Sequence, residues 1–85
     1  MKYSIIIAPK AKRQIDKLTE KAKNKLVNAL QELRKDPHIG KPLKAQLKGL
    51  FSYRIGDYRI IYDIVKEQLI IQGIKVMYRK DVYRK

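Results

Sequence analysis

The sequence contains no cysteine, a single histidine and no long apolar run, and each of these absences excludes a class of protein. Without cysteine the chain forms neither disulfide bonds nor thiolate metal sites, which fits a reducing compartment. The longest apolar run, residues 5–8, is far too short to span a membrane, and the first residues lack the apolar stretch of a signal peptide. No cluster of metal-ligating residues stands out. We therefore expect a cytoplasmic protein with no membrane partner, no metal and no cofactor.

Acidic residues are also scarce. Eight Asp and Glu residues stand against 21 Lys and Arg residues, which gives the 85-residue chain a formal net charge of +13. The excess is spread over both halves of the sequence and does not form a detachable tail. A folded surface this basic attracts polyanions, so we expect a nucleic acid or an acidic protein as partner. A basic surface that is merely solvated is the alternative.

The apolar pattern predicts an α+β fold with the element order βααβββ. Alternation with β-branched residues is typical of strands, and apolar stripes at helical spacing predict helices. The predicted elements are a strand over 2–8, helices over 10–20 and 21–35, a loop over 37–49, and strands over 50–56, 58–65 and 69–76. We expect the helical hairpin to pack on one face of a small antiparallel sheet.

Two arginines are predicted to lie side by side in the central hairpin. Gly56 and Asp57 form a two-residue turn of the Gly-X kind, typical of type II′, so that Arg54 pairs with Arg59 across the strands. The residues that alternate with these arginines are apolar or aromatic and are the better candidates for burial, which leaves both arginines on the open face. Two adjacent guanidinium groups can clamp a phosphate. The alternative is that each arginine pairs with a nearby carboxylate, Asp57 or Asp63.

The C-terminal residues 75–85 combine cations with tyrosines. Aromatic rings among cations suit the stacking of bases while the cations neutralise phosphates. A frayed basic tail is the alternative. The cations and tyrosines of this segment include Lys75, Tyr78, Arg79, Lys80, Tyr83 and Arg84.

These segments resemble the RelE/ParE toxin superfamily. Residues 53–62 (YRIGDYRIIY) resemble its R-x-G-D-Y-R-x-x-Y motif, and residues 47–49 (LKG) resemble its L-x-G lead-in. Residues 78–84 (YRKDVYR) resemble its closing H-R-x-x-V-Y motif. Element order and length match as well. The resemblance covers essentially the whole chain and implies a single RelE-like toxin domain over residues 1–85.

The resemblance implies the toxin of a type II toxin–antitoxin system. RelE-like members are metal-free endoribonucleases that cut mRNA in the ribosomal A site, whereas ParE-like members share the fold and poison DNA gyrase. The histidine of the closing motif corresponds to Tyr78 here, and one basic hairpin position falls near Ser52. The implied catalytic residues are Arg54, Arg59, Arg79 and Tyr83. The residues that we expect to bind RNA beside them are Lys48, Lys75, Tyr78, Lys80 and Arg84.

The implied reaction uses the 2′-hydroxyl group of RNA as the nucleophile. The arginines would stabilise charge on the scissile phosphate, while Tyr83 or Tyr78 would stack on a base or move a proton. The implied partners are mRNA, the ribosome and a cognate antitoxin with an acidic or amphipathic segment, which forms a toxin–antitoxin hetero-oligomer. Two alternatives stay open, namely a ParE-like gyrase poison and a non-catalytic basic module that binds RNA.

Overall fold

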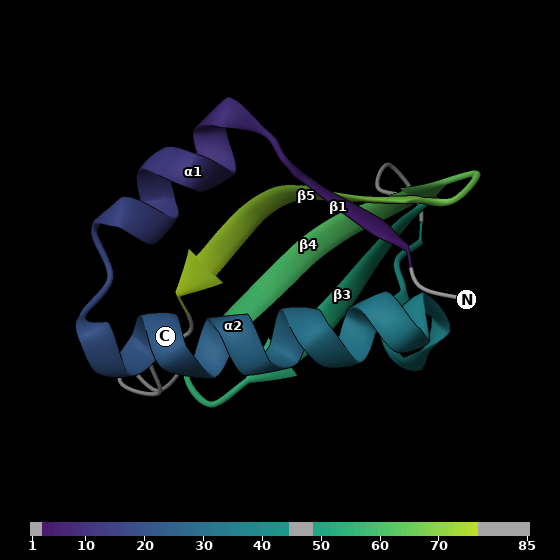
Figure 1. The fold of residues 1–85 in the computed structure, drawn as a ribbon. Coiled ribbons are helices and arrows are strands. Elements are labelled where there is room, and N and C mark those ends of the chain that lie inside the picture. Colours follow the sequence, from purple (N-terminus) through teal and green to yellow (C-terminus); the bar gives the residue numbers. More distant parts are fainter. Residues whose placement is uncertain (1–2, 45–48, 77–85) are drawn as a thin grey trace.

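Two layers make up the fold, a five-stranded sheet and a pair of helices that cover one of its faces (Figure 1). The computed structural model describes residues 3–44 and 49–76. The elements are β1 (Ser4–Ile7), α1 (Pro9–Asp16), α2 (Glu20–Lys35), the short 3-10 helix η1 (Pro37–Ile39), β2 (Lys41–Pro42), β3 (Leu50–Ile55), β4 (Tyr58–Val65) and β5 (Gln68–Val76).

The sheet is mixed, with the strand order β1-β5-β4-β3-β2. Strands β2 to β5 pair antiparallel, but β1 pairs parallel to β5. The predicted α+β architecture is confirmed, whereas the expectation of a wholly antiparallel sheet holds only for β2 to β5. Alternation along residues 2–8 predicts a strand, but it carries no information on which strand is its neighbour or in which direction the two run.

The helices are separated by a turn that ends the first one earlier than predicted. Helix α1 stops at Asp16, and α2 begins at Glu20. The hydroxyl oxygen of Thr19 accepts a hydrogen bond from the backbone N–H of Ala22 at 3.1 Å, which is the usual way to satisfy a free donor at a helix start. This cap explains why the predicted helices over 10–20 and 21–35 meet at residues 17–19.

The core lies between α2 and the covered face of the sheet. Helix α2 contributes a stripe of small and apolar residues that includes Leu26, Leu30 and Leu33. Against it pack Ile60 and Tyr62 of β4, both with 0 % of their surface exposed. A stripe at helical spacing against alternate strand residues is the pattern that predicted this packing.

The predicted loop over 37–49 contains structure that the sequence pattern does not show. Residues Lys41 and Pro42 form a two-residue edge strand on β3, and the N–H of Leu43 donates to the carbonyl oxygen of Leu50 at 2.8 Å. The fully buried Tyr62 hydroxyl donates to the carbonyl oxygen of Pro37 at 2.6 Å. The loop is therefore held to the sheet from the core side.

The described part of the chain contains neither a membrane-spanning helix nor a cluster of metal ligands. Over residues 3–44 and 49–76, no helix has the length and apolar character needed to cross a membrane. Within the same ranges, no three His, Cys, Asp or Glu side chains gather where they could hold a metal ion.

Candidate functional site

The tight turn between β3 and β4 brings the two predicted arginines together. Gly56 has a φ of +58°. In the described ranges Lys66 is the one non-glycine residue with a positive φ, so the φ of Asp57 is negative. A positive φ at the first turn position followed by a negative one at the second is the type II′ geometry. In the resulting register Arg54 lies opposite Arg59 and Ile55 lies opposite Tyr58, as predicted.

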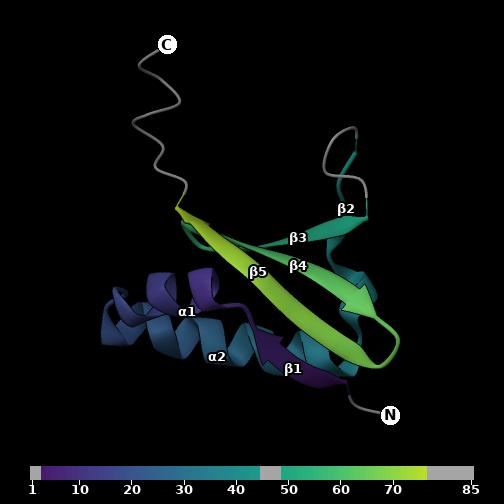
Figure 2. The same ribbon diagram turned by 90° about the horizontal axis from the view of Figure 1, so that it is seen from above.

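Figure 2 shows that both helices lie on one side of the sheet and leave its other face open. The register and the alternation along β3 and β4 assign both arginines to that open face. Alternate residues of β4 point to opposite faces, and Ile60 is fully buried under the helices. The neighbouring Arg59 is half-buried and Arg54 is exposed. The open face is therefore where a ligand can reach the pair.

A third cation extends the row across the sheet. Arg59 lies opposite Lys75 of β5, so residues from three adjacent strands carry positive charge side by side. A β-bulge produces this alignment, because Ile61 pairs with Gly73 while Tyr62 pairs with Ile71, which leaves Gln72 as an extra residue. Like charges directly opposite each other are destabilising, so the row favours the binding of an anion.

Carboxylates do not neutralise this row within residues 3–44 and 49–76. The ion pair found there joins His38 to Asp36 at 3.9 Å, and none joins Arg54 or Arg59 to Asp57 or Asp63. Within these ranges the structure therefore does not contain the alternative arrangement, in which each arginine pairs with a carboxylate.

The two guanidinium groups differ in their own hydrogen bonds. The Nε of Arg54 donates to the carbonyl oxygen of Gly56 at 3.3 Å, which directs this side chain back over the turn. The Nε of Arg59 is buried and has no hydrogen-bond partner among residues 3–44 and 49–76. A buried donor without a partner is rare in native proteins, so this N–H is a place where a bound acceptor would be favoured.

A cleft of about 360 Å³ lies over the arginine pair. Its lining residues are Ile39, Gly40, Lys41, Ser52, Tyr53, Arg54 and Arg59, and no carboxylate is among them. One wall is the η1–β2 segment, which the Tyr62 hydroxyl holds from below. Burial raises the pKa of that phenol to about 12, so Tyr62 stays protonated and acts as a structural donor.

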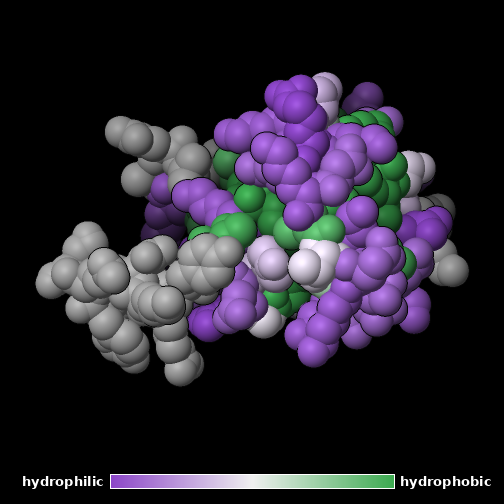
Figure 3. All heavy atoms as spheres, turned by 90° about the vertical axis from the view of Figure 1, so that its left-hand side faces the viewer, coloured by the Kyte–Doolittle hydropathy of each residue, from purple (hydrophilic) through white to green (hydrophobic). Residues whose placement is uncertain are grey.

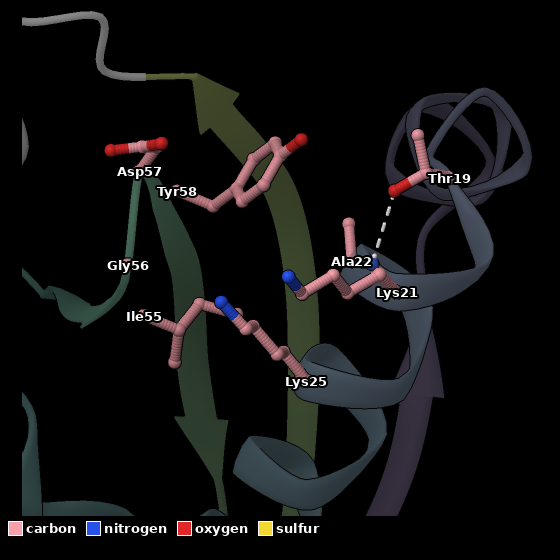
Figure 4. A pocket seen from close by; sticks show the side chains of 8 residues that line it. All are labelled: Thr19, Lys21, Ala22, Lys25, Ile55, Gly56, Asp57 and Tyr58. Carbon is pink, nitrogen blue, oxygen red and sulfur yellow. Dashed lines mark hydrogen bonds between the residues drawn. The ribbon is translucent and has the colours of Figure 1, made fainter.

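A second basic surface lies at the end of the hairpin, between the turn and α2. Figure 4 shows Lys21 and Lys25 extending from α2 toward Ile55 and Tyr58, while the carboxylate of Asp57 points away from both amines. These residues line a cavity of about 220 Å³.

This cavity adjoins an apolar one on the same side of the molecule. The second cavity has a volume of about 380 Å³ and is lined in part by Leu18, Tyr58, Ile74 and Val76. Figure 3 shows hydrophobic side chains gathered between hydrophilic rims on this side. We call the two cavities together the lysine-rimmed groove. Sequence patterns do not reveal it, because its walls come from distant parts of the chain.

The structure thus brings together three of the nine predicted site residues, namely Arg54, Arg59 and Lys75. The other six lie outside the described residues: Lys48, Tyr78, Arg79, Lys80, Tyr83 and Arg84. Sequence reasoning missed Lys41, which lines the cleft from β2. The sequence offered little indication of this role, because a lysine between a glycine and a proline in a loop is common.

Known proteins resemble this chain over its whole length. The family model of the ParE toxin of type II toxin–antitoxin systems (parDE) matches residues 5–83. Toxin RelG of Mycobacterium tuberculosis is 34% identical over 87 residues, covering 100% of both chains. Toxin RelE of the same organism is 36% identical over 84 residues, covering 96% of this chain and 87% of the relative.

Solved structures show the same fold. The toxin–antitoxin complex RelBE2 from Mycobacterium tuberculosis matches with a TM-score of 0.83 and 30% identity, over 89% of this chain and 99% of that chain. The isolated Escherichia coli RelE toxin matches with a TM-score of 0.80 over 96% of this chain and 92% of that chain. At 18% identity, the second match concerns the fold alone.

Proposed function

Because this chain belongs to the RelE/ParE superfamily and is a toxin of a type II toxin–antitoxin system, we propose that it cleaves mRNA on the ribosome as a metal-independent endoribonuclease. The observation that carries the proposal is the arginine pair. Arg54 and Arg59 lie opposite each other on the open face, and in the described ranges neither has a carboxylate partner. An RNA phosphate supplies the missing counter-charge and an acceptor for the buried Nε of Arg59.

The proposed reaction forms one phosphorus–oxygen bond, breaks another, and moves a proton at each oxygen. The 2′-hydroxyl oxygen attacks the adjacent phosphorus while its proton passes to a base. The bond from phosphorus to the 5′-oxygen breaks, and that oxygen takes up a proton. The products are a 2′,3′-cyclic phosphate and a 5′-hydroxyl end. Arg54 and Arg59 stabilise the charge that develops on the phosphate oxygens, and preorganised electrostatic stabilisation of this kind usually lowers the barrier most.

We assign the remaining roles to residues beyond the arginine pair. Arg79 adds a third guanidinium group, and Tyr83 stacks on a nucleotide or moves a proton. An ordinary tyrosine, with a pKa of about 10, is a weak base at neutral pH. Cleavage therefore depends on the ribosome to align the RNA, and the protein acts in the cytoplasm. The residues that bind RNA around this centre are Lys48, Lys75, Tyr78, Lys80 and Arg84.

The direct test compares Arg59→Ala and Arg79→Ala with the unaltered protein in ribosome-dependent mRNA cleavage and growth arrest. Removing one group that stabilises a transition-state charge lowers the rate by about 100-fold or more. Lys66→Ala is the matched control, because Lys66 is exposed in the turn between β4 and β5, at the other end of β4 from the arginines. Full cleavage by both arginine variants at normal protein levels would exclude the arginine clamp as the active site.

A ParE-like function is the second candidate, since the matching family model describes a ParE toxin. Such a toxin acts on DNA gyrase and needs no RNA-cleaving centre. The two functions separate in parallel assays of DNA supercoiling and of translation. Inhibition of supercoiling with translation intact would replace the nuclease proposal. If the protein binds RNA with strong salt dependence but forms no cleaved product, it is a non-catalytic module.

We propose a cognate antitoxin as the protein partner, in a toxin–antitoxin hetero-oligomer. The matched structure from Mycobacterium tuberculosis is a toxin–antitoxin complex, and the surface described above suits an acidic or amphipathic segment. Its acidic side chains would meet the rim lysines Lys21 and Lys25, and its apolar side chains would meet Leu18 and Tyr58 of the lysine-rimmed groove.

The antitoxin proposal is tested with the product of the adjacent reading frame. The double variant Lys21→Glu/Lys25→Glu should weaken the co-purified complex, because it places like charges against an acidic segment. Lys12→Glu/Lys35→Glu is the control, since both residues are exposed on the helices and line neither cavity. Equal retention of both double variants would place the antitoxin elsewhere. A complex that leaves Arg59 and Arg79 exposed would argue against inhibition by direct cover.

A further inference from the structure

Lys41 of β2 lies directly opposite Ser52 of β3 and lines the same cleft as the arginine pair. We propose that Lys41 is an additional phosphate-binding residue, which holds the RNA phosphate next to the scissile one and so positions the substrate strand. This inference rests on the proposed function and extends the site by a residue that no motif of the sequence indicates.

Strand geometry directs Lys41 toward the arginines. Residues paired across two strands project from the same face of the sheet, and Ser52 shares its face with Arg54 because the two are separated by two residues. One strand spacing and two residues of rise place the Cα of Lys41 about 8 Å from that of Arg54. Ser52 lies between the two cations, has a small side chain and lines the same cleft as they do.

The ammonium group of Lys41 is available for a ligand. Lys41 is exposed, and in the described ranges no carboxylate lies within ion-pair distance of it. The cleft that it lines contains three cationic side chains and no acidic one. An extended polyanion carries charges in series, which matches cations in series along a cleft better than a single small anion does.

The backbone that carries Lys41 is held in place. Pro42 fixes its own φ and keeps the preceding residue in extended conformation, and Leu43 continues the pairing through its hydrogen bond to Leu50. On the N-terminal side, the Tyr62 hydroxyl binds the carbonyl oxygen of Pro37. An added Cβ at Gly40 would meet that same hydroxyl, so the segment sits against it without spare room. The fold therefore presents Lys41 before RNA arrives.

The position of Lys41 in the sheet indicates whether it contacts the scissile phosphate or a neighbouring one. Arg54 and Arg59 form one cross-strand row, whereas Lys41 and Ser52 belong to a row two residues away. A phosphate clamped between the arginines leaves Lys41 to the next phosphate along the strand. Contacts to a non-reacting phosphate stabilise the ground state and the transition state alike, and their loss raises KM with little change in kcat.

The test compares Lys41→Ala, Lys41→Arg and Lys44→Ala. Lys44 is exposed, lies three residues further along the same segment and does not line the cleft, so it is a control for the loss of one charge. The probe is a short single-stranded RNA in which every 2′-hydroxyl is methylated, so that it binds without being cleaved. A second measurement follows single-turnover cleavage of mRNA on ribosomes as the toxin concentration is varied.

Lys41→Ala should weaken binding of the methylated RNA about fivefold at low salt. The slope of log K against log salt should become shallower by about 0.7, the value for one phosphate contact on a single strand. Lys41→Arg should restore the slope, and Lys44→Ala should leave it unchanged. On ribosomes, Lys41→Ala should raise the half-saturating toxin concentration and leave the maximal cleavage rate within about twofold.

The results distinguish the two proposals. Equal slopes for Lys41→Ala and Lys44→Ala, or a loss of maximal rate in Lys41→Ala, would overturn the assignment of Lys41 while the nuclease proposal stands. If the unaltered protein binds the RNA but cleaves no mRNA, the nuclease proposal fails, and the binding slopes still decide the role of Lys41. If the unaltered protein neither binds the RNA nor cleaves mRNA on ribosomes, both proposals fail. If it cleaves on ribosomes without binding free RNA, the half-saturating toxin concentration decides the role of Lys41.

Discussion

Replacing Arg59 with methionine should make the protein more stable while removing its activity. Two features of the structure oppose Arg59 in the folded state. Its buried Nε has no hydrogen-bond partner in the described part of the chain, and it lies between two cations, with Arg54 on one side and Lys75 on the other. Methionine keeps a flexible apolar stem of similar length without the charge or the donor.

The size of the gain follows from these two features. A buried donor without a partner costs about 1–3 kcal/mol, and a pair of like charges directly across a sheet costs ~0.2–1 kcal/mol. Arg59 is only half-buried, so water screens part of both effects and the lower ends apply. We therefore expect Arg59→Met to raise the free energy of unfolding by about 1–2 kcal/mol, which for a domain of this size raises Tm by roughly 5–10 °C.

Urea unfolding at low and at high salt measures this gain and separates its causes. The midpoint should rise with an unchanged m-value, which identifies a change in stability. In ~1 M salt the Debye length falls to about 3 Å, which screens the repulsion between the cations. The stability gained by Arg59→Met should therefore lose the part due to charge repulsion and keep the part due to the unpaired donor. Arg54→Met is the control, since Arg54 is exposed and its Nε is paired. A variant at position 59 that is less stable than the unaltered protein at low salt would refute the reasoning.

Three further predictions concern the frame of the site. Gly40→Ala should lower the free energy of unfolding by about 1–3 kcal/mol in urea titrations, because the new methyl group meets the Tyr62 hydroxyl and comes within 3.0 Å of the carbonyl oxygen of Ser52; an unchanged midpoint would show that the segment yields freely. Tyr62→Phe should cost about 1–2 kcal/mol through the lost bond to Pro37. Burial raises the Tyr62 pKa from 10.0 to about 12, so between these values the folded state holds the proton more tightly than the unfolded chain. Stability should therefore fall with rising pH across that window, by up to ~1.4 kcal/mol per pH unit. The Tyr62→Phe variant should lack this fall in stability. Identical pH profiles for the variant and the unaltered protein would show that the Tyr62 pKa is not its cause. Lys66→Gly should raise the free energy of unfolding by about 0.5–1 kcal/mol, because Lys66 has a φ of +55° that suits glycine; a lower free energy of unfolding would mean that the backbone there is not strained.

Local signals in the sequence were enough to predict the central hairpin. Glycine followed by aspartate between two alternating segments indicates a two-residue turn, and that turn alone sets Arg54 opposite Arg59. Alternation then assigns the faces, and the buried Ile60 and Tyr62 confirm the assignment. Both inferences need only residues that are close together along the chain.

Strand partners and edges could not be predicted in this way. The parallel pairing of β1 with β5 joins Ser4 to Gln68, residues far apart in the sequence. Strand β2 pairs with β3, and just before it in the chain the core residue Tyr62 donates a hydrogen bond to the carbonyl oxygen of Pro37. One basic position of the superfamily's hairpin falls near Ser52, which is not basic here, and the structure sets Lys41 across from it.

The sequence by itself determined the positive charge, the two helical stripes and the hairpin with its paired arginines, because charge is a sum over residues and each periodicity is a local property of the chain. Only the tertiary structure decided which other cations join that pair. One extra residue at Gln72 turns Lys75 to the face of Arg59, and a buried phenol brings Lys41 to the same cleft. Such placements depend on which distant segments of the chain pair and become buried together. The residues next to each other in the sequence carry no information about this pairing.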